Sequence, residues 1–319
     1  MNRFAWLAVA LVACGGPKPR EAGSRIGPAL AAAFAAADRE RAPWRCASPD
    51  GPKLADENLA IGGHVWKLAG HTATYEGRGA IAIGVIADAG GAPTMTIAAL
   101  GRLRALLGEA DVVIALGGMG ATQAELEATL GTLSQRGRLL VAIPGDLESV
   151  PAQTAAIAAL RARGRFVIDG RLARHIELPG VAIATVPGAS SATRLVSGSD
   201  GCGYRSADLA TLIGDLAVRP ELRVLASAEA PRVISGGEPT GELAVTPGAL
   251  HDIDIVLHAP TGERGSPARS GRRDGHRLPL TPGTSDATTR LPGPARRASA
   301  GLLTADRDGW SWKLVTDAE

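Results

Sequence analysis

The sequence predicts an α/β fold, because short apolar runs alternate along the chain with segments of helical periodicity. Three apolar runs of strand length lie at 80–87, 111–116 and 139–143. Continuous runs of this kind are typical of parallel strands that are buried on both faces. Each run is followed by a stretch whose apolar residues recur every three to four positions, as in a helix packed on a sheet. The order strand, helix, strand, helix, strand indicates parallel pairing.

Local signals place the remaining elements. Residues 58–75 contain short stretches that fit an edge hairpin. Thr122 and Glu125 form a capping box at the start of the second helix, and Pro151 stands near the start of the third. Helices are expected at 94–107, 122–133, 151–163 and 206–217, and further strands at 166–168, 175–178, 181–186, 223–226 and 253–257.

The composition changes after residue 262. Residues 263–298 are rich in Gly, Pro, Ser and Arg and have almost no apolar periodicity, which predicts a long loop. Alternation then returns, with Trp310, Trp312 and Leu314 on one face, so 299–319 is expected to supply edge strands that close the domain. The arginines of the loop either attract a phosphate or anionic surface or merely keep the loop solvated: Arg264, Arg269, Arg272, Arg273 and Arg277.

The first residues have the three parts of a bacterial export signal. Met1-Asn2-Arg3 carries positive charge, residues 4–12 are an unbroken apolar run, and small residues follow. As a helix this run would span only ~14 Å, which is too short for a hydrocarbon core of ~30 Å. Leu11-Val12-Ala13-Cys14 resembles the lipobox of bacterial lipoproteins. The resemblance implies that signal peptide 1–13 is removed and that Cys14 carries a diacylglycerol; an ordinary cleaved signal is the alternative.

A lipid on Cys14 implies an anchored protein of the bacterial cell envelope. Gly15, rather than Asp, follows the cysteine and favours the outer membrane, facing the periplasm or the surface. Residues 14–57 mix Pro, Gly, Ala and charge, which predicts a tether with one candidate helix at 29–41. The tether leads to a domain expected at 58–262.

Two cysteines remain once Cys14 is lipidated. Cys46 and Cys202 are an even pair, and in an oxidising compartment they are candidates for a disulfide. Two unpaired thiols are the alternative. The chain has no CxxC or HxxxH spacing, so a Cys/His zinc site is not expected.

Charge and aromatic content argue against a nucleic-acid-binding protein. The formal net charge is only +2, and just four of the 34 basic residues are lysines. Two Tyr and three Phe leave few rings on which bases would stack. The chain is therefore expected to bind no nucleic acid.

Charged residues and glycines follow the predicted strands, where the ligand sites of open α/β sheets form. Asp88-Ala89-Gly90, Gly117-Gly118 and Gly145-Asp146-Leu147-Glu148 follow the first three strands. In this register residues 80–262 resemble the calcineurin-like metallophosphoesterases, whose motifs D-x-H, G-D-x-x-D, G-N-H-(E/D), a His before a Pro and G-H-x-H each follow a strand. The resemblance implies two stacked β-sheets flanked by helices, an α/β/β/α sandwich. It also implies two metal ions that activate a water.

The motif frames match those of the family, whereas most ligand residues differ. Asp88 occupies the first acidic position, and Asp146 stands where the family has Asn. Phosphoester hydrolysis requires up to about 28 kcal/mol of barrier lowering, of which positioning supplies about 7–11 kcal/mol. Because the residues that hold the metals are replaced, the family reaction is expected to be lost. The other ligand positions carry Gly90, Gly118, Leu147, Ala228, Pro260 and Gly262.

Two further site hypotheses concern the same strand ends. Asp88, Asp146 and Glu148 are candidates to hold one divalent ion (Mn, Mg, Ca or Zn), since hard cations accept carboxylates. Alternatively, the two aspartates cap nearby helices. The glycines of residues 117–120 are suited either to cradling an anion with backbone N–H groups or to a tight turn.

These observations predict a membrane-tethered lipoprotein whose metallophosphoesterase-like domain is inactive and needs no cofactor. Such a domain is expected to act as a binding or scaffolding module for an envelope partner or a phosphorylated ligand. The alternative is an active metal-dependent phosphoesterase with a reduced one-metal site.

Overall fold

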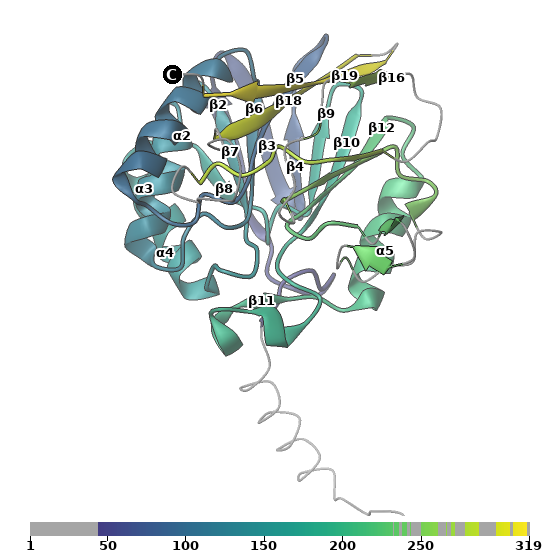
Figure 1. Cartoon of the computed structure of the whole chain (residues 1–319). Coiled ribbons are helices and arrows are strands. Elements are labelled where there is room, and N and C mark those ends of the chain that lie inside the picture. The colour runs from purple at the N-terminus through teal and green to yellow at the C-terminus, as the bar shows by residue number, and fades with distance from the viewer. Residues whose placement is uncertain are drawn as a thin grey trace, which may run out of the picture. The chain divides into compact units, whose positions relative to one another are not determined.

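Two large β-sheets lie face to face, with helices on their outer faces (Figure 1). This arrangement confirms the predicted fold class of two stacked sheets flanked by helices. The computed structural model describes residues 44–231, 233–235, 238–240, 243, 250–260, 266, 269–271, 278–286, 298–306 and 309–317. The predicted signal peptide, Cys14 and the candidate helix at 29–41 lie outside these residues. None of the helices in the described part is long and apolar enough to span a membrane.

The first sheet has seven strands in the order β16-β19-β18-β5-β6-β7-β8. Its parallel half is the predicted alternation of buried strands and helices. The three helices here and a fourth on the second sheet confirm the four predicted helices, with ends that agree to within one residue. The strands are β5 (Ile81–Ile86), β6 (Val112–Leu116), β7 (Leu139–Ile143) and β8 (Val167–Asp169), joined by α2 (Thr94–Leu106), α3 (Gln123–Leu133) and α4 (Val150–Ala162). The antiparallel half is β16 (Arg269–Gly271), β18 (Ser299–Ala305) and β19 (Trp310–Thr316).

The second sheet has eight strands in the order β17-β15-β12-β10-β9-β4-β3-β2. The predicted hairpin at its edge is formed by β2 and β3. The strands are β2 (Leu54–Ile61), β3 (His64–Gly70), β4 (Thr72–Tyr75), β9 (His175–Leu178), β10 (Val181–Val186), β12 (Leu222–Ser227), β15 (Ile255–His258) and β17 (Leu278–Leu280), with α5 (Ser206–Ala217) between β10 and β12. Two small ribbons pair β1 (Trp44–Arg45) with β11 (Cys202–Gly203), and β13 (Val233–Ser235) with β14 (Glu238–Thr240).

Three apolar layers hold the sandwich together. The largest lies between the sheets and includes Trp66 of β3 and Trp312 of β19, each 1% exposed. Helices α2, α3 and α4 cover the outer face of the seven-stranded sheet, and α5 covers the eight-stranded sheet (Figure 1). Strands buried on both faces explain why the sequence shows continuous apolar runs rather than alternation.

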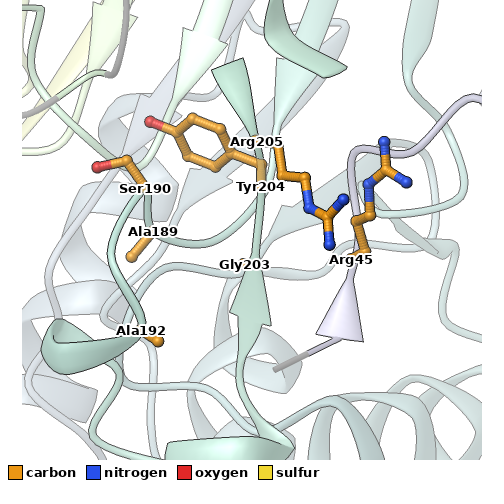
Figure 2. Close-up of a pocket in the computed structure, with 7 residues that line it drawn as sticks. All are labelled: Arg45, Ala189, Ser190, Ala192, Gly203, Tyr204 and Arg205. Carbon is orange, nitrogen blue, oxygen red and sulfur yellow. The ribbon is translucent and has the colours of Figure 1, made fainter. Parts of the chain in front are cut away.

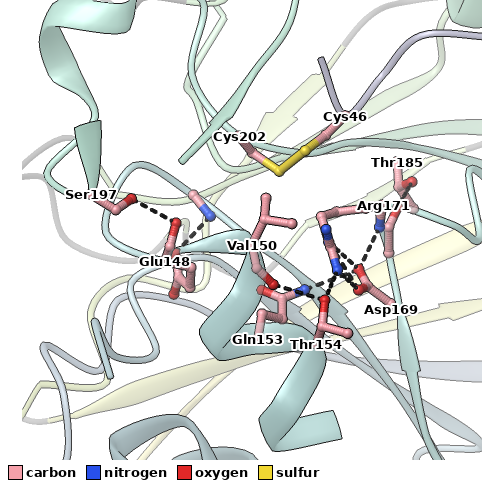
Figure 3. The surroundings of a disulfide bond; sticks show 12 residues. Cys46, Glu148, Val150, Gln153, Thr154, Asp169, Arg171, Thr185, Ser197 and Cys202 are labelled. Carbon is pink, nitrogen blue, oxygen red and sulfur yellow. Dashed lines mark hydrogen bonds and ion pairs between the residues drawn. A yellow bond between two sulfur atoms is a disulfide. The ribbon is translucent and has the colours of Figure 1, made fainter. Parts of the chain in front are cut away.

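The folded part begins before residue 58, where the tether was predicted to end. β1 pairs with β11, and β2 already begins at Leu54. Cys46 and Cys202, the two cysteines left for pairing, are joined by a disulfide that packs on Val150 at the start of α4 (Figure 3). Residues 44–46 look like a tether in sequence because β1 has only two residues and its pairing and disulfide depend on Cys202 and Gly203, which are distant in the chain.

The C-terminal prediction also needs correction. Residues 263–298 were predicted to be a loop, yet they contain β16 and β17, and Thr281–Ser285 is a buried segment. Ser285 donates its N–H to the carbonyl of Ala87, next to the end of β5. Likewise β18 and β19 are interior strands, because β16 extends the sheet beyond them. Strands of three residues are too short to leave a periodic signal.

Candidate functional site

A cavity of ≈ 190 Å³ lies at the carboxyl ends of the strands, where the sequence predicted a site. Loops after β5, β6 and β7 line one side of it, and loops after β12 and β15 line another. Gly, Ala and Pro form much of the wall. Its charged residues are Asp88, Asp146, Arg194 and Glu229.

Asp88 is held in an unusual backbone conformation at the end of β5. Its φ of 53° is the one positive value outside glycine among the described residues. Its carbonyl accepts hydrogen bonds from Thr284 Oγ1 (2.9 Å), in the buried segment Thr281–Ser285, and from Asp286 N (2.9 Å), directly after that segment. Left-handed backbone in a residue other than glycine is strained and gathers at functional sites. Contacts far along the chain therefore fix this carboxylate at the cavity.

The protonation of Asp88 depends on its surroundings. Burial raises the pKa of its carboxyl above the ordinary value, and the nearby charges of Asp286 and Asp146 raise it further. A hydrogen bond with Thr284 acts in the opposite direction. A carboxylate in such surroundings takes up a proton more readily than an exposed one.

Glu229 and Arg194 form the centre of the cavity's polar network. The Glu229 carboxylate is almost fully buried and is ion-paired with the Arg194 guanidinium. It also accepts hydrogen bonds from the Tyr204 hydroxyl and from Ser190 Oγ, the latter at 3.2 Å. Arg194 Nη2 lies 3.9 Å from Asp146 Oδ2, so one guanidinium faces two carboxylates. Burial raises the pKa of Glu229, while Tyr204 and Arg194 oppose the rise.

Neither Glu229 nor Arg194 was among the predicted site residues. Glu229 comes directly after β12, so the same reasoning that selected Asp88 would have found it. Arg194 ends the short 3₁₀ turn Ala192–Arg194, in a segment without periodicity, and no sequence signal marks it.

Glu148 has a different role from the other two predicted carboxylates. Asp88 and Asp146 line the cavity, but Glu148 does not. Its side chain is buried, and its two oxygens accept the backbone N–H groups of Met119 (2.5 Å) and Gly145 (2.8 Å). Burial raises its pKa, and these hydrogen bonds oppose the rise. Glu148 therefore ties the loops after β6 and β7 together, and the three carboxylates of the one-metal hypothesis do not all face the cavity.

The glycines after β6 form a tight turn. Gly117 and Gly118 have φ values of 65° and 69°. A Cβ at Gly118 would lie 2.8 Å from Asp88 Cα, and one at Gly117 would lie 2.8 Å from Gly145 Cα. The N–H of Met119 in this turn donates to the carboxyl group of Glu148 and is therefore not directed at an external anion. The close approach of the loops requires glycine at both positions.

Comparison with known proteins was made at the level of sequence and of structure. No family model and no curated protein matches this sequence. One crystal structure covers 75% of this chain and 100% of its own, at 10% identity and a TM-score of 0.54. The chain shares its fold with that protein. TT1561 of Thermus thermophilus (14% identity, 75% of this chain and 98% of its own, TM-score 0.46) and purple acid phosphatase PPD1 of yellow lupin (9%, 80% and 57%, 0.47) align more distantly.

The side chains at the cavity do not fit a two-metal centre. Among the described residues, no three His, Cys, Asp or Glu side chains gather around one point. At position 118, where the resemblance places a bridging Asp, a side chain would collide with Asp88. At position 90, where it places a His, a Cβ would lie 3.1 Å from Asp286 Oδ2. A guanidinium also faces the carboxylates that a metal would need.

Proposed function

We propose that this chain is a ligand-binding module of the bacterial cell envelope, anchored by lipid on Cys14, in which the metallophosphoesterase-like cavity binds without hydrolysis. The observation that carries the proposal is the position of Arg194, ion-paired with Glu229 and 3.9 Å from Asp146. A guanidinium and a divalent ion compete for the same carboxylates, and the guanidinium is part of the chain. The cavity is therefore organised around an internal cation.

The charge of the cavity indicates which ligands it favours. Asp88, Asp146 and Glu229 face it with one guanidinium, Arg194. The backbone N–H groups of Met119 and Gly145, which would have suited a phosphate, are bonded to Glu148. A phosphate would meet an excess of negative charge. The ligand that fits is a small polar molecule that donates hydrogen bonds, through hydroxyl or ammonium groups.

The second candidate is a phosphoesterase with one metal held by Asp88 and Asp146. The observation in its favour is that both carboxylates line the cavity and that the charge of Asp146 raises the pKa of Asp88. Two carboxylates and water make a recognised, though weak, site for a hard cation.

One experiment separates these functions. The full-length chain, purified in detergent, is analysed for bound metal and assayed for hydrolysis of bis(4-nitrophenyl) phosphate with added Mn²⁺, Mg²⁺ or Zn²⁺. The binding module is expected to hold no stoichiometric metal and to show no turnover above buffer. Stoichiometric metal and turnover that Asp88→Ala abolishes, while the exposed Asp215→Ala preserves both, would overturn the proposal.

A further inference from the structure

A second cavity of ≈ 190 Å³ lies at the N-terminal end of α5, beside β1 and β11. We call it the arginine pocket, because Arg45 and Arg205 line it together with Ser190 and Tyr204. Small residues at 189, 192 and 203 form the remaining wall. Figure 2 shows both guanidinium groups on the opposite side of β11 from the hydroxyls of Ser190 and Tyr204.

One carboxylate faces both arginines. The Asp208 side chain is 1% exposed and binds Arg45 in a two-pronged ion pair, through Nε (2.9 Å) and Nη2. Asp208 also accepts the backbone N–H of Arg205, at 3.1 Å. In the described part of the chain, no carboxylate forms an ion pair with the Arg205 guanidinium. Asp50 and the buried Arg174 add one nearby charge of each sign. Three cations and two anions therefore leave a net positive charge at the pocket.

The backbone adds to this charge. α5 has 12 residues and begins at Ser206, immediately after Arg205. The first turn of a helix carries a partial positive charge from its unpaired N–H groups. Guanidinium groups bind oxyanions through pairs of parallel N–H groups and recognise phosphate and carboxylate alike. Two such groups lining one cavity repel each other unless an anion lies between them.

We propose that the arginine pocket binds the oxyanion group, phosphate or carboxylate, of a small molecule. Arg205 supplies the uncompensated charge, and Arg45 is oriented by Asp208. The site is opposite in charge to the cavity that contains Asp88, so it selects a different part of a ligand or a different ligand. The two are physically connected, because Ser190 and Tyr204 line the arginine pocket and both donate to Glu229 of the first cavity.

The test uses the full-length chain in detergent and titrates inorganic phosphate, and separately acetate, at constant ionic strength, with calorimetry as the readout. Saturable binding is expected, weakened about tenfold or more in Arg205→Gln, since a charge-assisted contact is lost. Arg219→Gln is the matched control, because Arg219 follows the opposite end of α5 and pairs with Glu177. It is expected to leave the affinity unchanged.

Three results would overturn the proposal. If neither anion binds, the pocket is not an oxyanion site, and if both variants lose affinity equally, the binding reflects the general charge of the protein. A lipid source of the oxyanion is examined with vesicles that contain phosphatidylglycerol, against vesicles of phosphatidylcholine alone. Arg205-dependent binding to the former without any binding of free phosphate or acetate would assign the pocket to a headgroup and refute the small-molecule site.

Discussion

Arg194 and Glu229 form an ion pair inside the cavity at the carboxyl ends of the strands, although 35 residues separate them. The side chain of Glu229 is 3% exposed and that of Arg194 is 32% exposed. A carboxylate this deeply buried depends on its partners, since losing one leaves part of its charge uncompensated. The pair thus joins the loop before α5 to the end of β12.

Replacing Arg194 by Met tests this dependence. We expect the free energy of unfolding to fall by about 1–3 kcal/mol, a value reduced because Arg194 is partly exposed to solvent. Urea denaturation of the two proteins measures the difference. Arg163→Met is the control: its pair with Glu127 is more exposed, so its loss is expected to change the free energy of unfolding much less than the loss of the Arg194 pair. Equal losses in the two variants would contradict the structural role of Arg194.

Asp88 leads to a prediction about pH. Burial and the charges of Asp286 and Asp146 raise its pKa in the folded state. The folded protein therefore binds a proton more readily than the unfolded chain, and stability falls as pH rises from about 4, the unfolded value, through the raised pKa. Asp88→Asn keeps a residue that tolerates positive φ and removes the titration. We expect this variant to lose less stability than the original protein between acid and neutral pH.

The control for the pH experiment is Asp215→Asn, an exposed position on α5. Unfolding free energies are measured in urea at a series of pH values. If the pH profile is the same in Asp88→Asn and in the unaltered chain, burial does not raise the pKa of the Asp88 carboxyl in the folded protein.

Alanine substitutions at Gly118 and Gly214 are expected to change the stability of the fold in opposite directions. Gly118→Ala would place a Cβ 2.8 Å from Asp88 Cα at a φ of 69°, so we expect a loss of about 1–3 kcal/mol in stability. Gly214→Ala lies in α5 with nothing within 4 Å of the added carbon, and it is expected to stabilise by about 0.5–1 kcal/mol. Thermal unfolding compares them, and a Gly118→Ala protein as stable as the original would refute the close approach.

Much of the fold was predictable because its strands are buried on both faces and its helices carry periodic apolar residues. The segment from β5 to α5 shows both signals, and Thr122 with Glu125 forms the capping box that the sequence indicated. β16 and β17 were not predictable, since each has three residues within an Arg-rich and Gly-rich stretch. Their burial depends on pairing with strands distant in sequence.

The site was predictable in place but not in composition. Strand order positioned Asp88 and Asp146 at the cavity. The role of Glu148 depends on N–H groups of Met119 and Gly145, which only the folded loops bring to its side chain. Arg194 comes from an irregular segment, so its proximity to Glu229 follows from tertiary structure alone.

The disulfide between Cys46 and Cys202 closes a segment of 156 residues. Closing so long a loop restricts the unfolded chain and stabilises the folded state by up to about 5 kcal/mol. We expect the double variant Cys46→Ala with Cys202→Ala to unfold at a lower urea concentration by a corresponding amount. Treatment of the original protein with a strong reductant should give the same midpoint, whereas no change in either case would show that the linkage does not form in solution.

The lipid anchor proposed for Cys14 is tested by a single substitution. Cys14→Ser removes the thiol to which a diacylglycerol would be attached, so we expect the chain to leave the membrane fraction or to stay unprocessed, with its apolar run 4–12 retained. Cell fractionation and the mass of the purified chain distinguish the two results. Cys46→Ser is the control, because Cys46 is part of the disulfide and is not expected to carry lipid. Fractionation with membranes and a mass unchanged except for the sulfur-to-oxygen substitution would exclude lipidation of Cys14.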